Sequence, residues 1–112
     1  MSQLLVLDKA DVAAFSLLFK ALSNEYRIRI LNLLRNGPKN VGQISKALAL
    51  EQTVVSHNLK CLSFCGLIMN RKLGKLRIYS LNLETVDPIL RLGGKHISKY
   101  ASNLRTCGTL ER

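Results

Sequence analysis

The sequence contains no tryptophan and only three phenylalanines and three tyrosines. Proteins that bind single-stranded nucleic acid rely on exposed aromatic side chains on which bases stack. The scarcity of aromatic residues therefore argues against that class of protein.

Long apolar runs are also missing. No segment approaches the roughly 20 apolar residues that a transmembrane helix needs, and the apolar run at residues 4–7 is too short for the core of a signal peptide. We therefore expect a soluble cytoplasmic protein with no membrane partner. At 112 residues, the chain is expected to form a single domain over residues 1–112.

The motifs of common catalytic sites are absent from the sequence. It has no nucleophile elbow, no phosphate-binding glycine loop and no HExxH motif. The seven acidic residues are scattered and offer no general acid/base pair. We therefore expect no enzymatic activity.

The chain has three cysteines, an odd number that does not suit a disulfide framework. In a protein without a signal peptide, such residues are expected to be reduced thiols or metal ligands. Positive charge is abundant by contrast: 17 Lys and Arg against seven Asp and Glu give a net charge of +10. This excess favours a polyanionic partner, either nucleic acid or an anionic membrane surface.

Apolar residues at helical spacing predict two helices in the first third of the chain. The first covers residues 8–22, where Asp8 or Asp11 can cap its start, and Ser23 can cap the second. The second stops at residues 36–38, because Gly37 and Pro38 disfavour further helix. The apolar positions at helical spacing in the first helix are Val12, Phe15, Leu18, Phe19 and Leu22. The second helix is expected to bury Tyr26, Ile30, Leu31 and Leu34.

Residues 41–65 have the features of a helix-turn-helix. A short helix at 41–48 and a second at 52–65 are joined by three residues, and Gly66 ends the second helix. Its apolar positions are Val55, Leu59 and Leu62. Its front carries small polar side chains suited to the edges of DNA bases, and one lysine suited to phosphate: Gln52, Thr53, Ser56, His57 and Lys60. The alternative is that the front residues only cap and solvate the helix.

After Gly66 the pattern changes to a period of two over residues 67–81, which predicts a β-hairpin with glycine at its tip. A hairpin directly after a recognition helix is a wing, and its cations are placed to bind phosphates: Arg71, Lys72, Lys75 and Arg77. Helical spacing returns over residues 85–107, where Gly93 and Gly94 are expected to break the helix or to allow a partner to cross closely.

The segments 22–31 (LSNEYRIRIL), 54–62 (VVSHNLKCL) and 66–68 (GLI) resemble the ArsR/SmtB family of winged-helix repressors. The resemblance covers roughly residues 15–81. It implies a mainly α winged helix-turn-helix fold of about five helices with a two-stranded wing. It also implies a homodimer joined through the helices at 8–22 and 85–107, and a double-stranded DNA partner released when an inducer binds. Two-fold symmetry predicts an inverted-repeat operator.

Two metal sites of that family cannot be carried over, because residues 41–48 contain no cysteine and the last helix offers only Asp87 and His96. The segment 59–67 (LKCLSFCGL) instead resembles the CmtR-type cadmium and lead sensors. That resemblance implies a metal site formed by Cys61, Cys65 and, from the C-terminal segment, Cys107.

The spacing of Cys61 and Cys65 is compatible with such a site. Residues four apart on a helix have Cβ atoms about 5–6 Å apart, which lets one soft ion such as Cd, Pb or Zn bridge two thiolates. Three alternatives stay open. In the first, the thiols are inert core residues. In the second, they form a redox or persulfide switch; a disulfide would then need Cys107, because bridged Cβ atoms lie about 3.8 Å apart. In the third, the chain is a winged-helix module for protein contacts or for sequence-independent DNA packaging.

Overall fold

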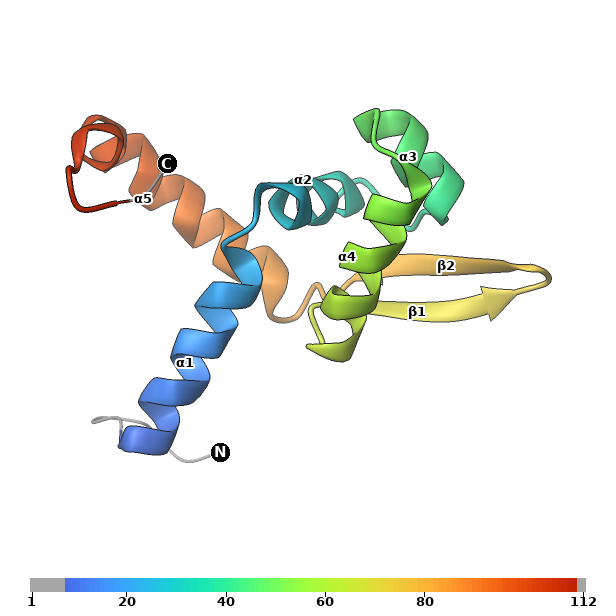
Figure 1. Cartoon of the computed structure of the whole chain (residues 1–112), viewed down its shortest axis with the longest axis horizontal. Helices are drawn as coiled ribbons and strands as arrows, with labels where there is room; N and C mark the ends of the chain where they lie inside the picture. Colours follow the sequence, from blue (N-terminus) through green and yellow to red (C-terminus); the bar gives the residue numbers. More distant parts are fainter. Residues whose placement is uncertain (1–7, 111–112) are drawn as a thin grey trace. The chain divides into compact units, whose positions relative to one another are not determined.

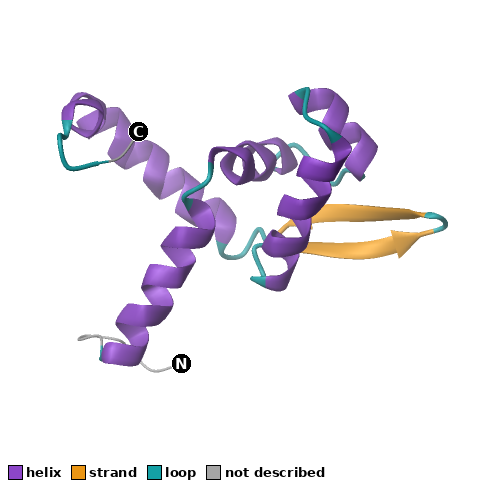
Figure 2. Cartoon of the chain, in the orientation of Figure 1, coloured by secondary structure: helices purple, strands orange, loops and turns teal. Residues whose placement is uncertain are grey.

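The computed structural model describes residues 8–110, so the apolar run at residues 4–7 lies outside it. Figures 1 and 2 show helices and one two-stranded hairpin in the described part of the chain. In chain order they are α1 (Lys9–Leu22), α2 (Glu25–Leu34), α3 (Val41–Leu48), α4 (Gln52–Phe64), β1 (Ile68–Leu73), β2 (Leu76–Leu81) and α5 (Val86–Thr106). The predicted five helices and wing are confirmed.

The start of α1 agrees with the sequence, whereas the start of α2 does not. The Asp11 N–H donates to Asp8 Oδ1 at 2.8 Å and the Asp8 N–H donates to Asp11 Oδ2 at 3.3 Å, which forms a capping box. The prediction that Ser23 caps α2 is wrong, because Ser23 ends α1 and Asn24 is the cap. The longer Asn24 side chain accepts the Arg27 N–H at 3.2 Å.

The helix-turn-helix has the predicted bounds, and its turn depends on one residue in a left-handed conformation. Ala49 has φ 54° and ψ 46°, and the Leu50 N–H donates to the Ser45 carbonyl at 3.1 Å. Gly66, with φ 76°, ends α4 as predicted, and the Leu67 N–H closes the helix end on the Leu62 carbonyl at 3.0 Å.

The core lies among α2, α3, α4 and the base of the hairpin. Its buried apolar residues within unit Met1–Leu81 are Ile30, Leu31, Leu34, Ile44, Val55, Leu59, Leu62, Leu67, Ile68 and Leu81. The prediction that Tyr26 is buried is wrong, because this residue is 44% exposed. Helix α1 has no buried residue. The apolar residues of α1 follow helical spacing, but they face outward in the single chain.

The wing is an antiparallel hairpin, as predicted, with Leu73 paired to Leu76 across the two-residue turn Gly74–Lys75. Gly74 has φ 63°, a conformation that costs glycine little. Lys39, just before α3, pairs with Tyr79 through two backbone hydrogen bonds of 3.0 and 2.9 Å. This bridge ties the entry to the helix-turn-helix to the wing.

The chain divides into two compact units at the boundary between Leu81 and Asn82. The second contains α5, which continues through Gly93 and Gly94 and departs from helical geometry at Tyr100 instead (φ −120°, ψ 18°). A break at the glycines is therefore wrong, since each glycine only lowers helix propensity and neither has a positive φ. The alternative, that a partner crosses closely there, stays a prediction. In residues 8–110 no helix combines the length and the apolarity that crossing a bilayer requires.

Candidate DNA interface and cysteine pair

The polar front of α4 is fully available for contact. Val55, Asn58 and Leu59 on the opposite side of the helix are buried. The five predicted DNA-binding residues are all exposed, namely Gln52, Thr53, Ser56, His57 and Lys60. Glu51 is the N-cap, and no side chain forms a capping hydrogen bond there. The front residues therefore form no capping hydrogen bond, and they are open to solvent.

A buried polar network fixes α4 against α2. The Arg27 Nε–H donates to Asn58 Oδ1 at 3.2 Å, and its Nη1–H donates to the Ala21 carbonyl at 3.0 Å. Asn58 is 4% exposed and donates from Nδ2 to the Val54 carbonyl at 2.9 Å. The sequence offered one signal for this network that we did not use, namely an asparagine on the apolar side of α4.

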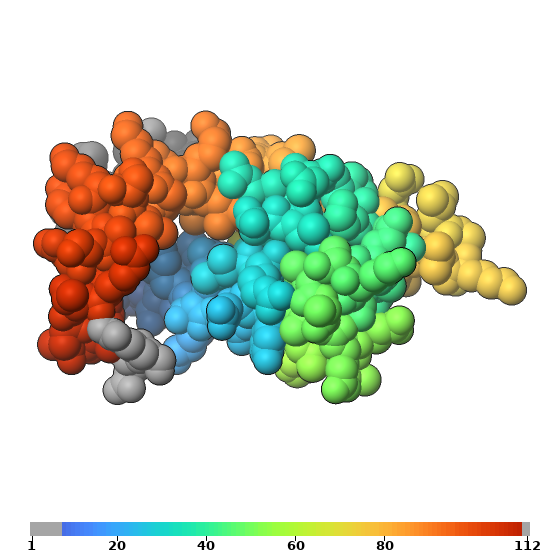
Figure 3. All heavy atoms as spheres, turned by 90° about the horizontal axis from the view of Figure 1, so that it is seen from above, coloured from blue at the N-terminus to red at the C-terminus, as the bar shows by residue number. Residues whose placement is uncertain are grey.

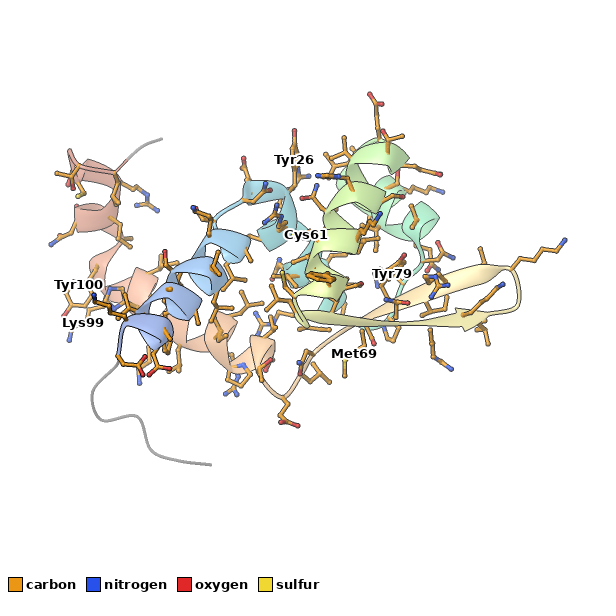
Figure 4. The ribbon with its side chains drawn as sticks, turned by 60° about the horizontal axis from the view of Figure 1, so that its bottom comes forward. Tyr26, Cys61, Met69, Tyr79, Lys99 and Tyr100 are labelled. Atoms are coloured by element: carbon orange, nitrogen blue, oxygen red, sulfur yellow. The ribbon has the colours of Figure 1, made fainter. Side chains whose placement is uncertain are left out.

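Tyr26 adds a side chain that the sequence interpretation placed in the core. It lines an open hollow between α2 and α4 together with Thr53 and His57, and Figure 4 shows its ring projecting outward from α2. A phenolic hydroxyl next to these two residues enlarges the polar face of α4. The helical spacing of Tyr26 could not reveal this, because it is shared by buried and boundary positions.

Two of the four wing cations, Lys75 and Arg77, lie beside the start of α4. Arg71, Lys72, Lys75 and Arg77 are all exposed. Lys75 and Arg77 line a hollow with Gln52 of α4 and Gly42 of α3, and Figure 3 shows the yellow tip of the hairpin projecting past the green atoms of α3 and α4. The polar front of α4 and the cations of the wing therefore belong to one compact unit.

Cys61 and Cys65 lie at the other end of α4. Cys61 is half-buried and lines a hollow with Lys20 and Arg27, while Cys65 is the exposed C-cap. Burial raises the pKa of the Cys65 thiol, the neighbouring Cys61 raises it further, and the Arg27 guanidinium opposes the rise. Figure 4 shows Cys61 on the ribbon of α4.

Cys107 is the C-cap of α5 and belongs to the second unit. Its sulfur lies 3.1 Å from Thr109 Oγ1, and this hydrogen bond lowers the pKa of the Cys107 thiol. All three cysteines are free thiols. Among residues 8–110 no group of three His, Cys, Asp or Glu side chains gathers as a metal site. The pair on α4 supplies two soft donors, which fit part of the ligand set of a thiophilic ion.

Comparison with protein families gives one match in the middle of the chain. The family described as "Bacterial regulatory protein, arsR family" matches residues 24–69, which include α2, α3 and α4. This range contains the Arg27–Asn58 network and the whole polar front of α4.

Three curated relatives are transcriptional regulators. The regulator NmtR of Mycobacterium tuberculosis is 37% identical over 75 residues, which are 67% of this chain and 62% of NmtR. The transcriptional repressor SdpR of Bacillus subtilis is 34% identical, covering 77% of this chain and 96% of SdpR. A Staphylococcus aureus homologue of the cadmium resistance regulatory protein CadC is 33% identical, covering 75% and 70%.

Three solved structures share the fold. Rv0081 of M. tuberculosis has a TM-score of 0.77 at 27% identity, covering 85% of this chain and 96% of that one. The homodimeric winged helix-turn-helix domain Mb0332 of Mycobacterium bovis has a TM-score of 0.73 at 26% identity, covering 89% and 95%. The antimony-specific repressor AntR has a TM-score of 0.73 at 25% identity, covering 90% and 90%. The names of the three curated relatives describe regulators of transcription, and none of the three describes an enzyme.

Proposed function

This chain belongs to the ArsR family of bacterial regulatory proteins, and we propose that it is a homodimeric repressor whose DNA binding is weakened by a thiophilic metal ion. The observation that carries the proposal is the arrangement of α4. Its exposed polar front and its cysteine pair lie on one helix, which the Arg27–Asn58 network holds rigidly against α2.

The proposed DNA contacts divide by chemistry. Gln52, Thr53, Ser56 and His57 enter the major groove, where Gln suits adenine and Ser or Thr is permissive. Lys60 and the four wing cations Arg71, Lys72, Lys75 and Arg77 bind phosphates. Two copies of α4 related by a two-fold axis read an inverted repeat. Support for the dimer comes from the homodimeric structural relative and from the exposed apolar face of α1.

The proposed inducer is a soft ion such as Cd, Pb or Zn. Cys61 and Cys65 supply two thiolates, and Cys107 supplies a third from the C-terminal segment. The names of two relatives, a cadmium resistance regulator and an antimony-specific repressor, support this class of inducer. A metal bound at Cys61 and Cys65 would pull on the C-terminal half of the helix that reads DNA. An allosteric coupling of about 1–3 kcal/mol would weaken DNA affinity roughly 5- to 150-fold.

The first test is a titration of the reduced, metal-free protein with Cd(II), followed by thiolate-to-metal charge-transfer absorption in the ultraviolet. We expect saturation at about one equivalent per protomer, lost in Cys61→Ser and Cys65→Ser and weakened in Cys107→Ser. Lys60→Ala is the matched control on α4, because it should lower operator affinity and leave the metal titration unchanged.

The same variants separate the competing interpretations. Cys61→Ser should bind the operator as the parent does and fail to release it when Cd(II) is added. Full release by Cys61→Ser would rule out its role as a ligand. If no saturable band forms but mild oxidation or persulfide weakens operator binding, a redox switch replaces the metal proposal. Binding that ignores both operator sequence and metals would indicate a DNA-packaging module.

A further inference from the structure

A chain of two side-chain hydrogen bonds joins α4 to the wing. Asn70 of β1 lies in the middle: its Nδ2–H donates to Ser63 Oγ on α4 at 3.2 Å, and its Oδ1 accepts from Arg77 Nη1 on β2 at 2.7 Å. Asn70 and Arg77 are exposed, and Ser63 is half-buried. We refer to these three residues as the Ser63–Asn70–Arg77 chain.

The chemistry of the three groups fixes the direction of the chain. A guanidinium can only donate, so the amide oxygen of Asn70 must face Arg77. The amide nitrogen then faces Ser63, whose hydroxyl oxygen has lone pairs to accept it. A side chain that both accepts and donates is needed at the centre, and asparagine meets that requirement with a short, stiff stem.

Arg77 is held more firmly than the other wing cations. For Arg71, Lys72 and Lys75 the structure shows no side-chain hydrogen bond within residues 8–110, whereas the Arg77 guanidinium is joined to Asn70 by a bond of 2.7 Å. One bond to Asn70 uses only one of the five N–H groups of the guanidinium. The remaining donors are available at the hollow that Arg77 shares with Gln52 and Lys75.

Ser63 gives the chain its link to the cysteine pair. It lies on α4 between Cys61 and Cys65, two residues from each. A displacement of this part of α4 therefore moves the hydroxyl that accepts from Asn70. The base of the hairpin is buried at Leu67 and Ile68, so Asn70 itself has a fixed backbone position relative to α4.

We propose that Asn70 is a positioning residue that orients Arg77 toward a DNA phosphate, and that Ser63 connects this orientation to the cysteine-bearing end of α4. The inference rests on the proposed function and extends it. The recognition helix and the wing then respond together when the end of α4 moves, although only α4 carries the metal ligands.

A double-mutant cycle on operator affinity tests the positioning role. Fluorescence anisotropy is measured for the full-length protein and for Asn70→Ala, Arg77→Ala and the double variant. Arg77→Ala should weaken binding by about 100-fold, because the dimer loses two charge-assisted hydrogen bonds that each contribute roughly tenfold. Asn70→Ala should weaken it about two- to fivefold, and it should have no further effect when Arg77 is already Ala.

Salt dependence distinguishes positioning from loss of charge. Arg77→Ala removes one phosphate contact per protomer, so the slope of log affinity against log salt should fall by about 1.8 for a dimer. Asn70→Ala keeps the arginine charge and should leave that slope nearly unchanged. Arg71→Ala is the matched control in the hairpin, because Arg71 lies on the opposite face of β1 from Asn70 and Arg77, so its effect should add to that of Asn70→Ala. Unchanged thermal unfolding of Asn70→Ala, whose side chain is exposed, confirms that the fold is intact.

Ser63→Ala tests the link to α4. It keeps the Asn70–Arg77 bond, so metal-free operator affinity should stay close to that of the parent, while the loss of affinity on adding Cd(II) should shrink. An additive effect of Asn70→Ala in the Arg77→Ala background would overturn the positioning role even where Arg77 binds DNA. An Arg77→Ala variant with parental affinity would overturn both this inference and the proposed phosphate contact. If the double-mutant cycle shows coupling between Asn70 and Arg77, but Ser63→Ala loses as much operator affinity on adding Cd(II) as the parent does, only the link through Ser63 would be overturned.

Discussion

At the scale of single residues, α4 is held against α2 by a hydrogen-bonded polar pair, the buried Asn58 and the half-buried Arg27. Asn58 carries two hydrogen bonds in a nearly dry environment: one accepted from Arg27 and one donated to its own helix at the Val54 carbonyl. Arg27 completes its contacts at the Ala21 carbonyl, where α1 ends. A buried network of this kind is stabilising only when every member is satisfied. The Arg27–Asn58 pair therefore joins the end of α1, the start of α2 and the middle of α4.

The Asn58→Ala variant should lose about 1–3 kcal/mol of unfolding free energy, because Arg27 Nε would lose its acceptor in a partly buried position. Urea denaturation of the parent and of Asn58→Ala, at the same protein concentration, measures the difference in unfolding free energy. The matched control is Ser56→Ala on the exposed side of the same helix, which should change stability by less than about 0.5 kcal/mol. Equal unfolding free energies for the two variants would show that the buried network contributes nothing to stability.

At the scale of elements, the geometry of the helix-turn-helix depends on the end of α3. Ala49 adopts the left-handed region although it carries a Cβ, and such a residue is strained relative to glycine. The strain persists because the turn is tied on both sides. The Leu50 N–H is bonded to the Ser45 carbonyl, the Ser45 hydroxyl donates to the Leu50 carbonyl, and Arg29 Nη2 donates to the Leu48 carbonyl at 2.8 Å.

The same substitution should have opposite effects at two alanines of this region. Ala49→Gly relieves the left-handed strain and should raise the free energy of unfolding by about 0.5–1 kcal/mol. Ala47→Gly, at an exposed position inside α3, should lower it by about 1 kcal/mol, because glycine has poor helix propensity. Thermal denaturation of the two variants beside the parent checks the signs. A loss of stability in both would contradict the strained turn.

Local signals in the sequence were sufficient for most element boundaries. Asp8, Gly66 and Gly74 act through short-range caps and turns, so the starts and ends they predict are confirmed. Tyr26 and the kink at Tyr100 were missed, because burial and helix distortion depend on tertiary packing that spacing alone does not encode. The Ser63–Asn70–Arg77 chain was also missed, because side-chain hydrogen bonds between α4 and the wing depend on tertiary packing as well.

The sequence predicted the polar front of α4 better than it predicted the grouping of the three cysteines. The exposed front of α4 follows from periodicity, because the apolar positions Val55, Leu59 and Leu62 fix which side faces the core. The pairing of Cys61 with Cys65 follows from their spacing of four. Spacing cannot assign Cys107 to the same site, because the path of the chain from the wing to the end of α5 depends on tertiary packing, which spacing does not encode. Its role as a ligand therefore stays a prediction.

At the scale of the whole molecule, the surface of α1 is the strongest argument for a dimer. The helix has no buried residue, yet it exposes Val12 (54%), Phe15 (40%) and Phe19 (59%) at helical spacing. Phe15 and Phe19 also stack on each other, with ring centroids 6.2 Å apart. A 14-residue helix has little stability of its own in water, and contiguous exposed apolar side chains are typical of a protein interface. A second copy of the chain is the partner that the proposed inverted repeat requires.

The double variant Phe15→Ala, Phe19→Ala should shift the protein from dimer to monomer in sedimentation equilibrium at micromolar concentration. Two phenyl groups would no longer be buried between the protomers, and each contributes several kcal/mol when it is fully removed from water. Ser16→Ala, also exposed on α1, is the control and should stay dimeric.

DNA binding gives a second, independent measurement. In a dimer, binding of the second recognition helix to its half-site is an intramolecular event. The monomeric double variant should therefore lose most of its affinity for a full operator. Its weak affinity for a single half-site should change little. Equal losses on both DNAs would mean that the phenylalanines support the fold of one chain rather than the pairing of two.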